Sequence, residues 1–377
     1  MVKLALYLHL PFCRQRCRYC SFISTAGRTA EMPAYVRALV SDIGLRRRVG
    51  AQIETVYFGG GTPSLLESSQ VGEILDAIRA NYAITDNAEV TLEVNPGTVN
   101  GTYLRLLREK GINRLSLGIQ SLDEDELRLL GRQHSVLEAV DAVHQARTAG
   151  FDNLSLDFIY GVPRRDIEKW MAILQKIVGL GAEHLSLYAL SLEEGTALAE
   201  AVRSGEVMPP DQDVVAQEYE LAGDMLERAG YRQYEISNWA RPGYESRHNL
   251  TYWTGGDYLG LGCGAHSFLN GTRYAGTDSL DEYLETLGAG RLVRQVADSL
   301  TPRMALGEAV MLGLRLNVGV MADDIRARFG IDLQEHFKTE IAELVALGLL
   351  EEDKRRLRLT PRGRLLGNEV FIRFLPA

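Results

Sequence analysis

The sequence predicts an α/β fold built around an open, partial (β/α)6 barrel of the TIM-like kind, followed by a C-terminal helical module. Up to about residue 190, short β-rich runs alternate with longer helical patterns, which is typical of βα units and a parallel sheet. Polar or glycine-rich segments follow most of the predicted strands, where a barrel gathers its functional groups. After residue 300 the pattern becomes mainly helical.

The predicted barrel core covers residues 1–190. Its strands are expected at 4–10, 55–58, 89–94, 114–117, 154–159 and 185–190, and its helices at 32–49, 68–81, 102–110, 136–149 and 167–179. Asn100 and Ser135 are the expected N-caps of two of these helices, and Gly111 and Gly150 are expected to end two of them.

The rest of the chain is expected to form two further parts. Residues 191–300 are less regular, with an amphipathic helix at 212–230 and a strand at 234–237, and we interpret them as an elaboration around the barrel mouth. Residues 301–377 are expected to contain helices at 303–315, 321–329 and 333–347, two short strands near 350 and 357–359, and a last helix. This order resembles a winged-helix module.

Length and composition set limits on function. The chain of 377 residues suits one large domain with an appendage, or two domains, and 46% hydrophobic with 24% charged residues is ordinary globular composition. The net charge of −9 argues against broad binding to nucleic-acid phosphates. No apolar run approaches the roughly 20 residues that span a bilayer, and the start lacks a signal-peptide pattern. We expect a cytoplasmic protein, and a peripheral association with a membrane stays open.

The most informative segment is a cysteine loop near the start. Three of the four cysteines, Cys13, Cys17 and Cys20, lie within eight consecutive residues. A loop this short can aim three thiolates at one point. An iron-sulfur cube takes one thiolate per iron, so three thiolates leave one iron open to another ligand. The spacing therefore favours a cluster with an open coordination position.

A zinc site and a disulfide framework are the alternatives to a cluster at these cysteines. A closed zinc site is tetrahedral and would need a fourth ligand, such as His9. A disulfide framework is disfavoured, because four cysteines in a long chain differ from the dense pattern of small secreted domains.

The loop Cys13-x-x-x-Cys17-x-x-Cys20, with Tyr19 before the last cysteine, resembles the cluster loop of the radical S-adenosylmethionine (SAM) enzymes. The resemblance implies a [4Fe-4S] cluster ligated by these three cysteines, with the fourth iron chelated by the amino and carboxylate groups of SAM. It also implies that one electron splits SAM into methionine and a 5'-deoxyadenosyl radical, so that the cofactor supplies the chemistry. An electron donor for the cluster is then an expected partner.

A glycine-rich segment, 59–63, follows the second predicted strand. Its three glycines suit a tight turn, because glycine adopts positive φ easily, but its bare backbone can also approach a ligand closely. In the radical SAM family a GGxTP-like segment holds the SAM amino group. The resemblance therefore implies that role for Gly60, Gly61 and Thr62.

Four polar residues later in the chain suit SAM binding, three of them at predicted strand ends and Arg132 in the segment after the fourth strand. Glu93 and Gln120 can bond to ribose hydroxyls, and the planar fork of Arg132 can pair with the methionyl carboxylate. Asp157 follows an apolar run, where an unpartnered acid would be costly. Each of them is individually compatible with an ordinary satisfied polar residue. Together with the cysteines and the glycine segment they resemble the pattern of the HemN-like family, which implies SAM contacts at Tyr7, Tyr19, Gly60, Gly61, Thr62, Glu93, Gln120, Arg132, Asp157 and Ala189.

Two features separate the branches of that family. The oxygen-independent coproporphyrinogen III dehydrogenases, which decarboxylate porphyrinogen propionates with two SAM molecules, typically carry an extra cysteine two residues past the third. Here that position is Phe22, and the cysteine loop begins almost at Met1, without the N-terminal extension of that branch. Both departures favour the second branch, the HemW-like haem chaperones.

The segment 248–253 matches the HNxxYW pattern associated with haem in HemW-like proteins. An imidazole is a good axial ligand for haem iron, and aromatic rings can cover a porphyrin face. The resemblance implies that His248, Asn249, Tyr252 and Trp253 belong to the haem region. A lone histidine among aromatics is more often a hydrogen-bonded structural residue, so iron ligation by His248 stays open.

Cys263 and the basic run 354–358 each have two interpretations. Cys263 is expected to be a buried apolar residue, although its glycine neighbours also suit a close approach of backbone to the adenosyl group or haem. The basic run 354–358 is expected to be a solvated hairpin tip, with DNA contact as its alternative.

The sequence as a whole predicts a haem chaperone that binds a [4Fe-4S] cluster, SAM and haem, and delivers haem to haem-accepting apoproteins such as respiratory enzymes, some of them at a membrane surface. No nucleic-acid partner is expected. The alternatives are coproporphyrinogen III dehydrogenase, a haem-degrading radical methyltransferase, and a regulatory DNA-binding module on a vestigial barrel. Cleavage of SAM and homodimer formation stay open.

Overall fold

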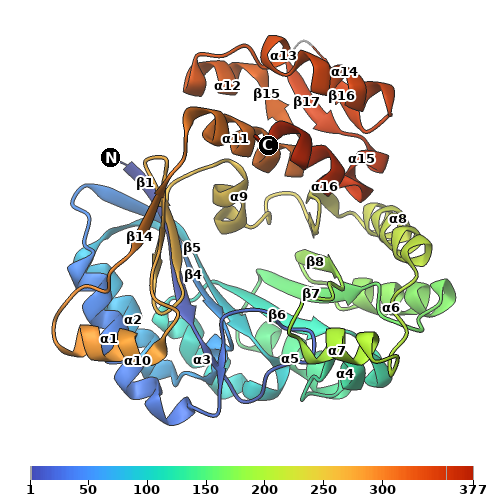
Figure 1. Ribbon diagram of the computed structural model, residues 1–377. Helices are drawn as coiled ribbons and strands as arrows, with labels where there is room; N and C mark the ends of the chain where they lie inside the picture. The colour runs from blue at the N-terminus through green and yellow to red at the C-terminus, as the bar shows by residue number, and fades with distance from the viewer. Residues whose placement is uncertain (1, 354, 377) are drawn as a thin grey trace.

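The computed structural model describes residues 2–353 and 355–376 and is organised around one curved sheet (Figure 1). Its 12 strands lie in the order β14-β13-β12-β11-β1-β4-β5-β6-β7-β8-β10-β9. The six central parallel strands are β1 (Val2–Leu10), β4 (Ala51–Gly60), β5 (Ala83–Val94), β6 (Arg114–Gln120), β7 (Leu154–Tyr160) and β8 (His184–Ala189). They confirm the six predicted strands of an α/β partial barrel, and their ladder ends on both sides in further strands without closing within the described residues.

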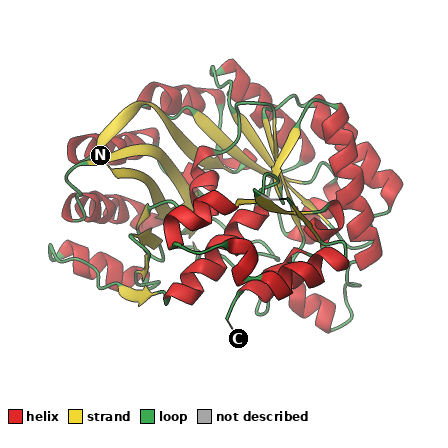
Figure 2. Ribbon diagram, turned by 90° about the horizontal axis from the view of Figure 1, so that it is seen from above, coloured by secondary structure: helices red, strands yellow, loops and turns green. Residues whose placement is uncertain are grey.

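Helices cover the outer face of this sheet (Figure 2). They are α1 (Met32–Leu45), α2 (Ser68–Asn81), α3 (Gly101–Lys110), α5 (Val136–Thr148) and α6 (Ile167–Gly179), with α8 (Gln212–Arg228) against α6. Asn100 and Ser135 cap α3 and α5 through their side chains, as predicted. Gly111 ends α3 in the left-handed conformation, which glycine adopts at little cost.

Residues 191–300 extend the sheet at both edges, which the sequence did not indicate. At the β1 edge β11 (Tyr258–Leu261) runs parallel to β1, followed by the antiparallel strands β12 (His266–Leu269), β13 (Thr272–Ala275) and β14 (Val296–Ser299). At the β8 edge lie β10 (Asn238–Ala240) and β9 (Arg232–Glu235). The helices of this part are α7 (Ala197–Arg203), α9 (Arg247–Trp253) and α10 (Leu280–Gly288).

The C-terminal module has its own hydrophobic core and a three-stranded sheet, in the order β15-β17-β16. Its elements, in the order that a winged helix predicts, are α11 (Pro302–Arg315), β15 (Val320–Met321), α12 (Ala322–Phe329), α13 (Leu333–His336), α14 (Lys338–Ala346), β16 (Leu350–Glu352), β17 (Arg356–Leu359), α15 (Pro361–Leu365) and α16 (Gly367–Phe371). The helix predicted at 333–347 is divided at Phe337, whose ring is buried in the module core.

Several short elements were not predicted. They are α4 (Glu124–Leu130), the small sheet of β2 (Phe12–Cys13) and β3 (Thr25–Ala26), and the 3-10 turns η1 (Thr29–Glu31), η2 (Pro63–Leu65), η3 (Pro96–Thr98) and η4 (Ile372–Phe374). Helix α9 was also missed, because its seven residues contain two β-branched or aromatic positions for every clear helix former.

The side chains of the central strands alternate between a dry and a polar face. Leucines and phenylalanines of β5 to β8, such as Leu92, Leu117, Leu156 and Phe158, point outward and are fully buried under the helices. The residues between them, such as Glu93, Ser116, Asp157 and Ser186, line a cavity on the concave face. Because side chains alternate along a strand, one ladder builds both the core and the site.

Candidate functional site

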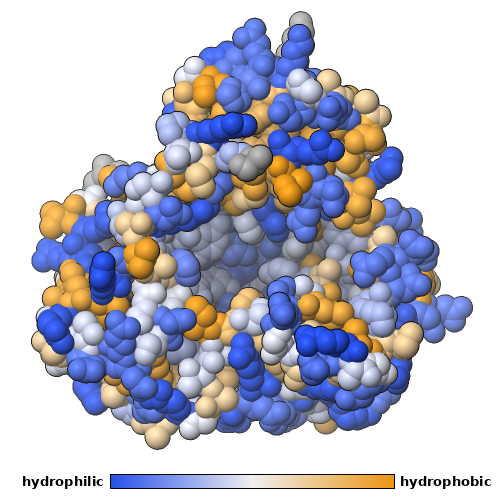
Figure 3. Space-filling view, viewed as in Figure 1, coloured by the Kyte–Doolittle hydropathy of each residue, from blue (hydrophilic) through white to orange (hydrophobic). Residues whose placement is uncertain are grey.

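A cavity of about 400 Å³ opens on the concave face of the sheet. Figure 3 shows the surface hollowed there, between the C-terminal module and the barrel. Its volume lies in the range of small-molecule sites, which is roughly 300–1,000 Å³. The cavity joins the cysteine loop, the glycine-rich segment, the C-terminal end of β5 and the concave face of β6 to β8.

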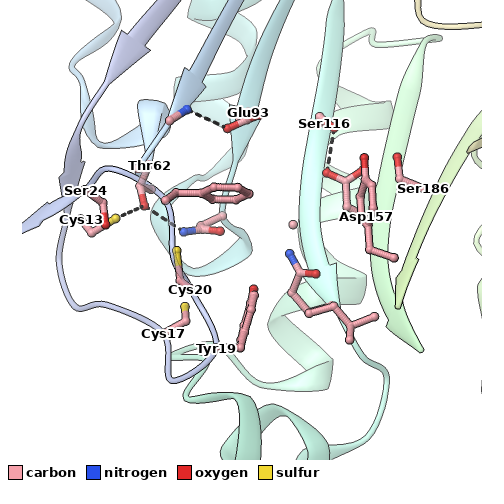
Figure 4. Close-up of a pocket in the computed structure, with 18 of the residues that line it drawn as sticks. Cys13, Cys17, Tyr19, Cys20, Ser24, Thr62, Glu93, Ser116, Asp157 and Ser186 are labelled. Carbon is pink, nitrogen blue, oxygen red and sulfur yellow. Dashed lines mark hydrogen bonds between the residues drawn. The ribbon is translucent and has the colours of Figure 1, made fainter. Parts of the chain in front are cut away.

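All three cysteines of the loop line this cavity and are free thiols (Figure 4). Cys13 is buried, whereas Cys17 and Cys20 are half-buried. Burial raises the pKa of the Cys13 and Cys20 thiols, so a bound cation would be needed to hold them as thiolates near neutral pH. Among the described residues, no three His, Cys, Asp or Glu side chains come close enough to share one metal ion. A cluster that takes one thiolate per iron would not need the three thiols to share one ion.

His9 has no free nitrogen for a zinc ion. Its Nε2 lies 2.8 Å from the Ile23 carbonyl oxygen and its Nδ1 lies 3.0 Å from the Tyr7 hydroxyl. The first bond needs a proton on Nε2, so Nδ1 accepts from Tyr7. The zinc alternative therefore has no support from the geometry of His9.

Polar groups approach the thiols from two sides. Thr62 Oγ1 donates to Cys13 Sγ at 3.5 Å, and Arg132 Nη1 donates to Cys17 Sγ at 3.5 Å. The other Arg132 nitrogen, Nη2, donates to Asn95 Oδ1 at 2.5 Å and to the Gly118 carbonyl at 2.6 Å. Its Nε is buried without a partner among the described residues. Arg132 is thus held beside the cysteines with one donor uncommitted, as a carboxylate-binding arginine would be.

The glycine-rich segment forms the end of β4 and turns directly beneath the cysteine loop. Gly60 has φ of +120°, and a Cβ at Gly61 would lie 2.6 Å from the Phe12 carbonyl oxygen, so neither position tolerates a side chain without rearrangement. The segment thus packs against the protein's own loop as closely as against the cavity. Thr62 then begins the turn η2.

Glu93, at the end of β5, is bound on both oxygens. Its Oε1 accepts from the Tyr57 hydroxyl at 2.9 Å and its Oε2 from the Gly60 amide at 3.2 Å. Burial raises the pKa of Glu93 to about 7, against the opposing effect of the Tyr57 bond. Glu93 is therefore partly protonated near neutral pH, and a bound cation would favour its ionised form.

The carboxylate of Asp157, across the cavity on β7, accepts hydrogen bonds from hydroxyl groups. Ser116 Oγ donates to its Oδ2 at 2.8 Å and Ser155 Oγ to its Oδ1 at 3.2 Å (Figure 4). Burial raises the pKa of Asp157, although the serine hydroxyls act in the opposite direction. The sequence marked Asp157 as costly unless partnered, and these serines are its partners.

Gln120 ends β6 in a strained conformation. Its φ is +70°, a region that non-glycine residues rarely adopt, and the β6 to β7 register shifts just before it. The distortion turns the end of the strand so that Gln120 lines the cavity.

The other predicted SAM contacts divide into two groups. Tyr19 and Ala189 line the cavity. Tyr7 does not belong to its lining; it lies on β1 with its hydroxyl on His9 and its ring stacked near Tyr57. A contact between Tyr7 and a ligand would therefore need a rearrangement of this pair.

The HNxxYW segment forms α9, which packs between β4 and the C-terminal module (Figure 1). His248 is 1% exposed, with Nδ1 2.7 Å from Thr55 Oγ1 and Nε2 2.7 Å from the Tyr252 hydroxyl. Burial lowers the pKa of His248 to about 3. Both nitrogens are occupied, so this geometry favours the structural interpretation of His248 over iron ligation.

The rest of α9 faces two different neighbours. Asn249 lines the cavity. Trp253 instead packs under the Arg315 guanidinium of α11, at 4.3 Å from the ring centroid, and its Nε1 has no partner among the described residues. The segment therefore connects the cavity to the C-terminal module.

Cys263 and the basic run 354–358 both contact other groups of the protein, as far as the run is described. Cys263 is 1% exposed, as expected for a buried apolar residue. Its backbone N–H donates to the Tyr35 hydroxyl and is therefore not free to bind a ligand. The adjacent Gly262 and Gly264 approach His9 and Ile23 closely, so the expected close approach is to protein and not to a ligand. In the basic run, Lys354 lies outside the described residues, and Arg356 and Arg358 pair with acidic neighbours on the hairpin.

Several cavity residues were missed by sequence reasoning. They are Tyr57, Asn95, Arg114, Ser116, Ser155, Ser186 and Tyr188. Tyr57, Asn95 and Ser155 lie two residues from Gly59, Glu93 and Asp157, which were singled out. The strand period of two was therefore a signal that could have found them.

No helix in the described part of the chain is long and apolar enough to cross a membrane.

Comparisons with known proteins agree with this geometry. Residues 7–177 match the family model of the Radical SAM superfamily, and residues 300–366 match that of the HemN C-terminal domain. The solved structure of coproporphyrinogen III oxidase (HemN) from Escherichia coli superimposes with a TM-score of 0.87 at 24% identity, over 99% of this chain and 90% of that chain. This likeness shows the fold.

Curated relatives match over nearly the whole chain. Heme chaperone HemW of Lactococcus lactis subsp. lactis is 33% identical over 98% of this chain and 96% of the relative, and HemW of Mycobacterium tuberculosis is 38% identical over 97% and 93%. The mouse protein named radical S-adenosyl methionine domain-containing protein 1, mitochondrial, is 37% identical over 99% and 88%. The chain therefore belongs to the HemW family of the radical SAM superfamily.

Proposed function

We propose that this protein is a haem chaperone that holds a [4Fe-4S] cluster and SAM in the barrel cavity, binds haem, and delivers it to haem-accepting apoproteins. The observation that carries the proposal is the similarity over the whole length to proteins named heme chaperone HemW, 33% identical over 98% of the chain in one case. The membrane surface as a place of delivery and an electron donor as a partner belong to the same proposal.

The cavity supports the binding of the cluster and SAM. Cys13, Cys17 and Cys20 would ligate three irons, and the cluster would supply the electron for SAM cleavage. The free donor of Arg132, beside Cys17, suits the SAM carboxylate. The remaining contacts would come from Tyr19, Gly60, Gly61, Thr62, Glu93, Gln120, Asp157 and Ala189, with Tyr7 behind them.

The haem region is proposed around α9. Asn249 reaches the cavity, Trp253 packs against Arg315 of the C-terminal module, and the Tyr252 ring packs against Tyr258 of β11. His248 contributes through its bonds to Thr55 and Tyr252, which fix the helix. We propose an axial ligand other than His248, because ligation by this residue would break a buried bond.

The second candidate is oxygen-independent coproporphyrinogen III dehydrogenase, whose fold the chain shares. The cysteine loop speaks against it, since Phe22 occupies the position of the extra cysteine. Phe22 is 67% exposed beside the cluster loop.

The test begins with anaerobic reconstitution with iron and sulfide, followed by quantification of metal, sulfide and haem on the purified protein. Haem-loaded protein is then mixed with a haem-free b-type haem protein, and transfer is followed by the absorption of the acceptor. We expect a bound cluster, retained haem and transfer to the acceptor. Failure to retain haem, or robust formation of protoporphyrinogen from coproporphyrinogen with SAM and reductant, would overturn the chaperone assignment. If the purified protein retained only zinc, the assignment of a [4Fe-4S] cluster would be overturned as well.

A further inference from the structure

The side chain of Arg114 is buried on the concave face with an uncommitted donor. Arg114 begins β6, is 2% exposed, and contributes to the lining of the cavity. Its Nε is buried and has no hydrogen-bond partner among residues 2–353 and 355–376. A buried guanidinium is strongly unfavourable unless a negative charge compensates it. Arg114 therefore needs an anion close by.

Glu93 and Asp157 line the same cavity as Arg114. Glu89, the other buried acid on this face of β5, accepts from the backbone amides of Arg247 and His248. In the β5 to β6 ladder Thr91 pairs with Arg114 and Glu93 pairs with Ser116, so Glu93 is a diagonal neighbour of Arg114. Diagonal neighbours lie roughly 7–8 Å apart, within reach of a long side chain. Asp157 accepts from Ser116, which lies two residues from Arg114 on the same face.

Among the described residues, no cation forms a hydrogen bond or ion pair with either acid. Glu93 accepts from Tyr57 and Gly60, and Asp157 accepts from Ser116 and Ser155, all of which are neutral groups. Burial raises the pKa of both acids, to about 7 for Glu93, and the charge of Arg114 acts in the opposite direction on both. The positive charge of Arg114 therefore favours two ionised carboxylates in a buried cavity.

The other titratable groups that face this part of the cavity stay neutral near pH 7. Burial raises the pKa of the tyrosines, which are Tyr7 on β1, Tyr57 on β4, Tyr188 on β8, Tyr234 on β9 and Tyr252 on α9. Burial likewise lowers the pKa of His184 and His248, and the Arg114 charge lowers both further. The charge balance of this region thus depends on Arg114 and the two acids.

We propose that Arg114 is a positioning residue for SAM, because it is buried on the same face of the sheet as Glu93 and Asp157 and its charge stabilises the carboxylates that receive the cationic end of the ligand. With both acids ionised, these three side chains carry one net negative charge. SAM carries a sulfonium, an ammonium and a carboxylate. The negative charge of this trio would face the two cationic groups, while Arg132, which lines the same cavity, would take the carboxylate. The inference rests on the proposed SAM site and adds a residue that does not itself touch the ligand.

The test compares Arg114→Gln and Arg114→Lys with the wild type, and with Arg105→Gln as a control that removes an exposed arginine from α3. The dissociation constant of SAM for the cluster-loaded protein is measured by calorimetry from pH 6 to pH 9. At pH 7 we expect Arg114→Gln to bind SAM about tenfold more weakly, from the interaction of unit charges at the diagonal distance. Affinity should approach that of the wild type at pH 9, where Glu93 ionises without help, and Arg114→Lys should restore most of it at pH 7.

A second measurement needs no SAM. The infrared band of protonated Glu93 is identified by its loss in Glu93→Gln, and its titration is followed in the apoprotein. In Arg114→Gln the band should persist to a higher pH than in the wild type.

The outcomes separate this inference from the proposed function. An unchanged affinity and an unchanged infrared titration would overturn the role of Arg114. An equal loss of affinity at every pH would overturn it too, because it would indicate structural damage. If the wild-type protein with its cluster bound no SAM, the proposed function would fail, while the infrared titration would still decide whether Arg114 controls Glu93.

Discussion

The buried arginine Arg165 gives the sharpest stability prediction. It follows β7 and lies with its side chain 1% exposed between Glu218 of α8 and Glu126 of α4. Its Nε and Nη2 donate to the two oxygens of Glu218 at 2.8 and 2.9 Å, and Nη1 donates to Glu126 at 3.0 Å. The guanidinium also lies 4.3 Å from the ring centroid of Trp170. We predict that Arg165→Met strongly destabilises this side of the barrel.

The magnitude follows from the charges left behind. Both acids are nearly inaccessible, with side chains 1% and 4% exposed, so water cannot replace the lost partner. Removing one member of a buried pair costs roughly 3–5 kcal/mol. The loss of the contact with Trp170 adds about 1 kcal/mol, and Lys169, 3.5 Å from Glu126, offsets part of the total. We expect a loss of about 4 kcal/mol.

Hydrogen exchange measured by mass spectrometry is the suitable assay, because it reports local opening without assuming that two modules unfold together. The peptides to follow cover α6 and α8. Arg203→Met is the matched control, since its pair with Glu200 is exposed and worth at most about 1 kcal/mol. Arg165→Met/Glu218→Met should recover part of the loss, because it removes an unpaired charge as well. A cost no greater than that of Arg203→Met would refute the reasoning.

Three further predictions concern the site and its pH dependence. Cys17→Ala should abolish the cluster absorption after reconstitution and leave the circular dichroism unchanged, because the half-buried Cys17 contributes no core packing; a full cluster band would contradict the ligand assignment. His248→Ala should leave the axial ligation of bound haem unchanged and lower the free energy of unfolding by roughly 1–3 kcal/mol, since it strands two buried hydroxyls; a changed haem spectrum would restore His248 as a ligand. Burial lowers the pKa of His134 to about 4, so the unfolded chain binds the proton first and stability should fall by up to about 3 kcal/mol between pH 6.5 and pH 4. In His134→Gln this part of the acid sensitivity should be lost, and an unchanged urea midpoint profile would refute it.

Local signals were sufficient for the elements of the barrel. The alternation of strand and helix, and the caps at Asn100 and Ser135, depend on neighbours in the sequence, and the structure contains them. Some bounds differ, since β4 and β5 begin four and six residues before the expected positions. The shared location of Cys13, Cys17 and Cys20 could also be predicted from the sequence, because a short loop brings its thiols into one region whatever the rest of the fold does. Strand ends placed Glu93, Gln120 and Asp157 on one cavity for the same reason.

Contacts between residues far apart in the sequence could not be predicted in this way. The parallel union of β11 with β1 joins residues some 250 positions apart in the chain, and no local pattern indicates it. The same holds for one of the two bonds that occupy His248, which comes from Thr55 on β4. A sequence motif marks a histidine as suitable for iron, but only its neighbours in space decide whether a nitrogen is free.

The sequence by itself thus determined the fold class, the cysteine loop and the family resemblance, because each depends on residue type and local spacing. Tertiary structure alone decided the charge partners, such as Arg165 for Glu126 and Glu218. The physical reason is that the energy of a buried charge depends on distance and solvent exclusion, and both are properties of the assembled sheet and helices.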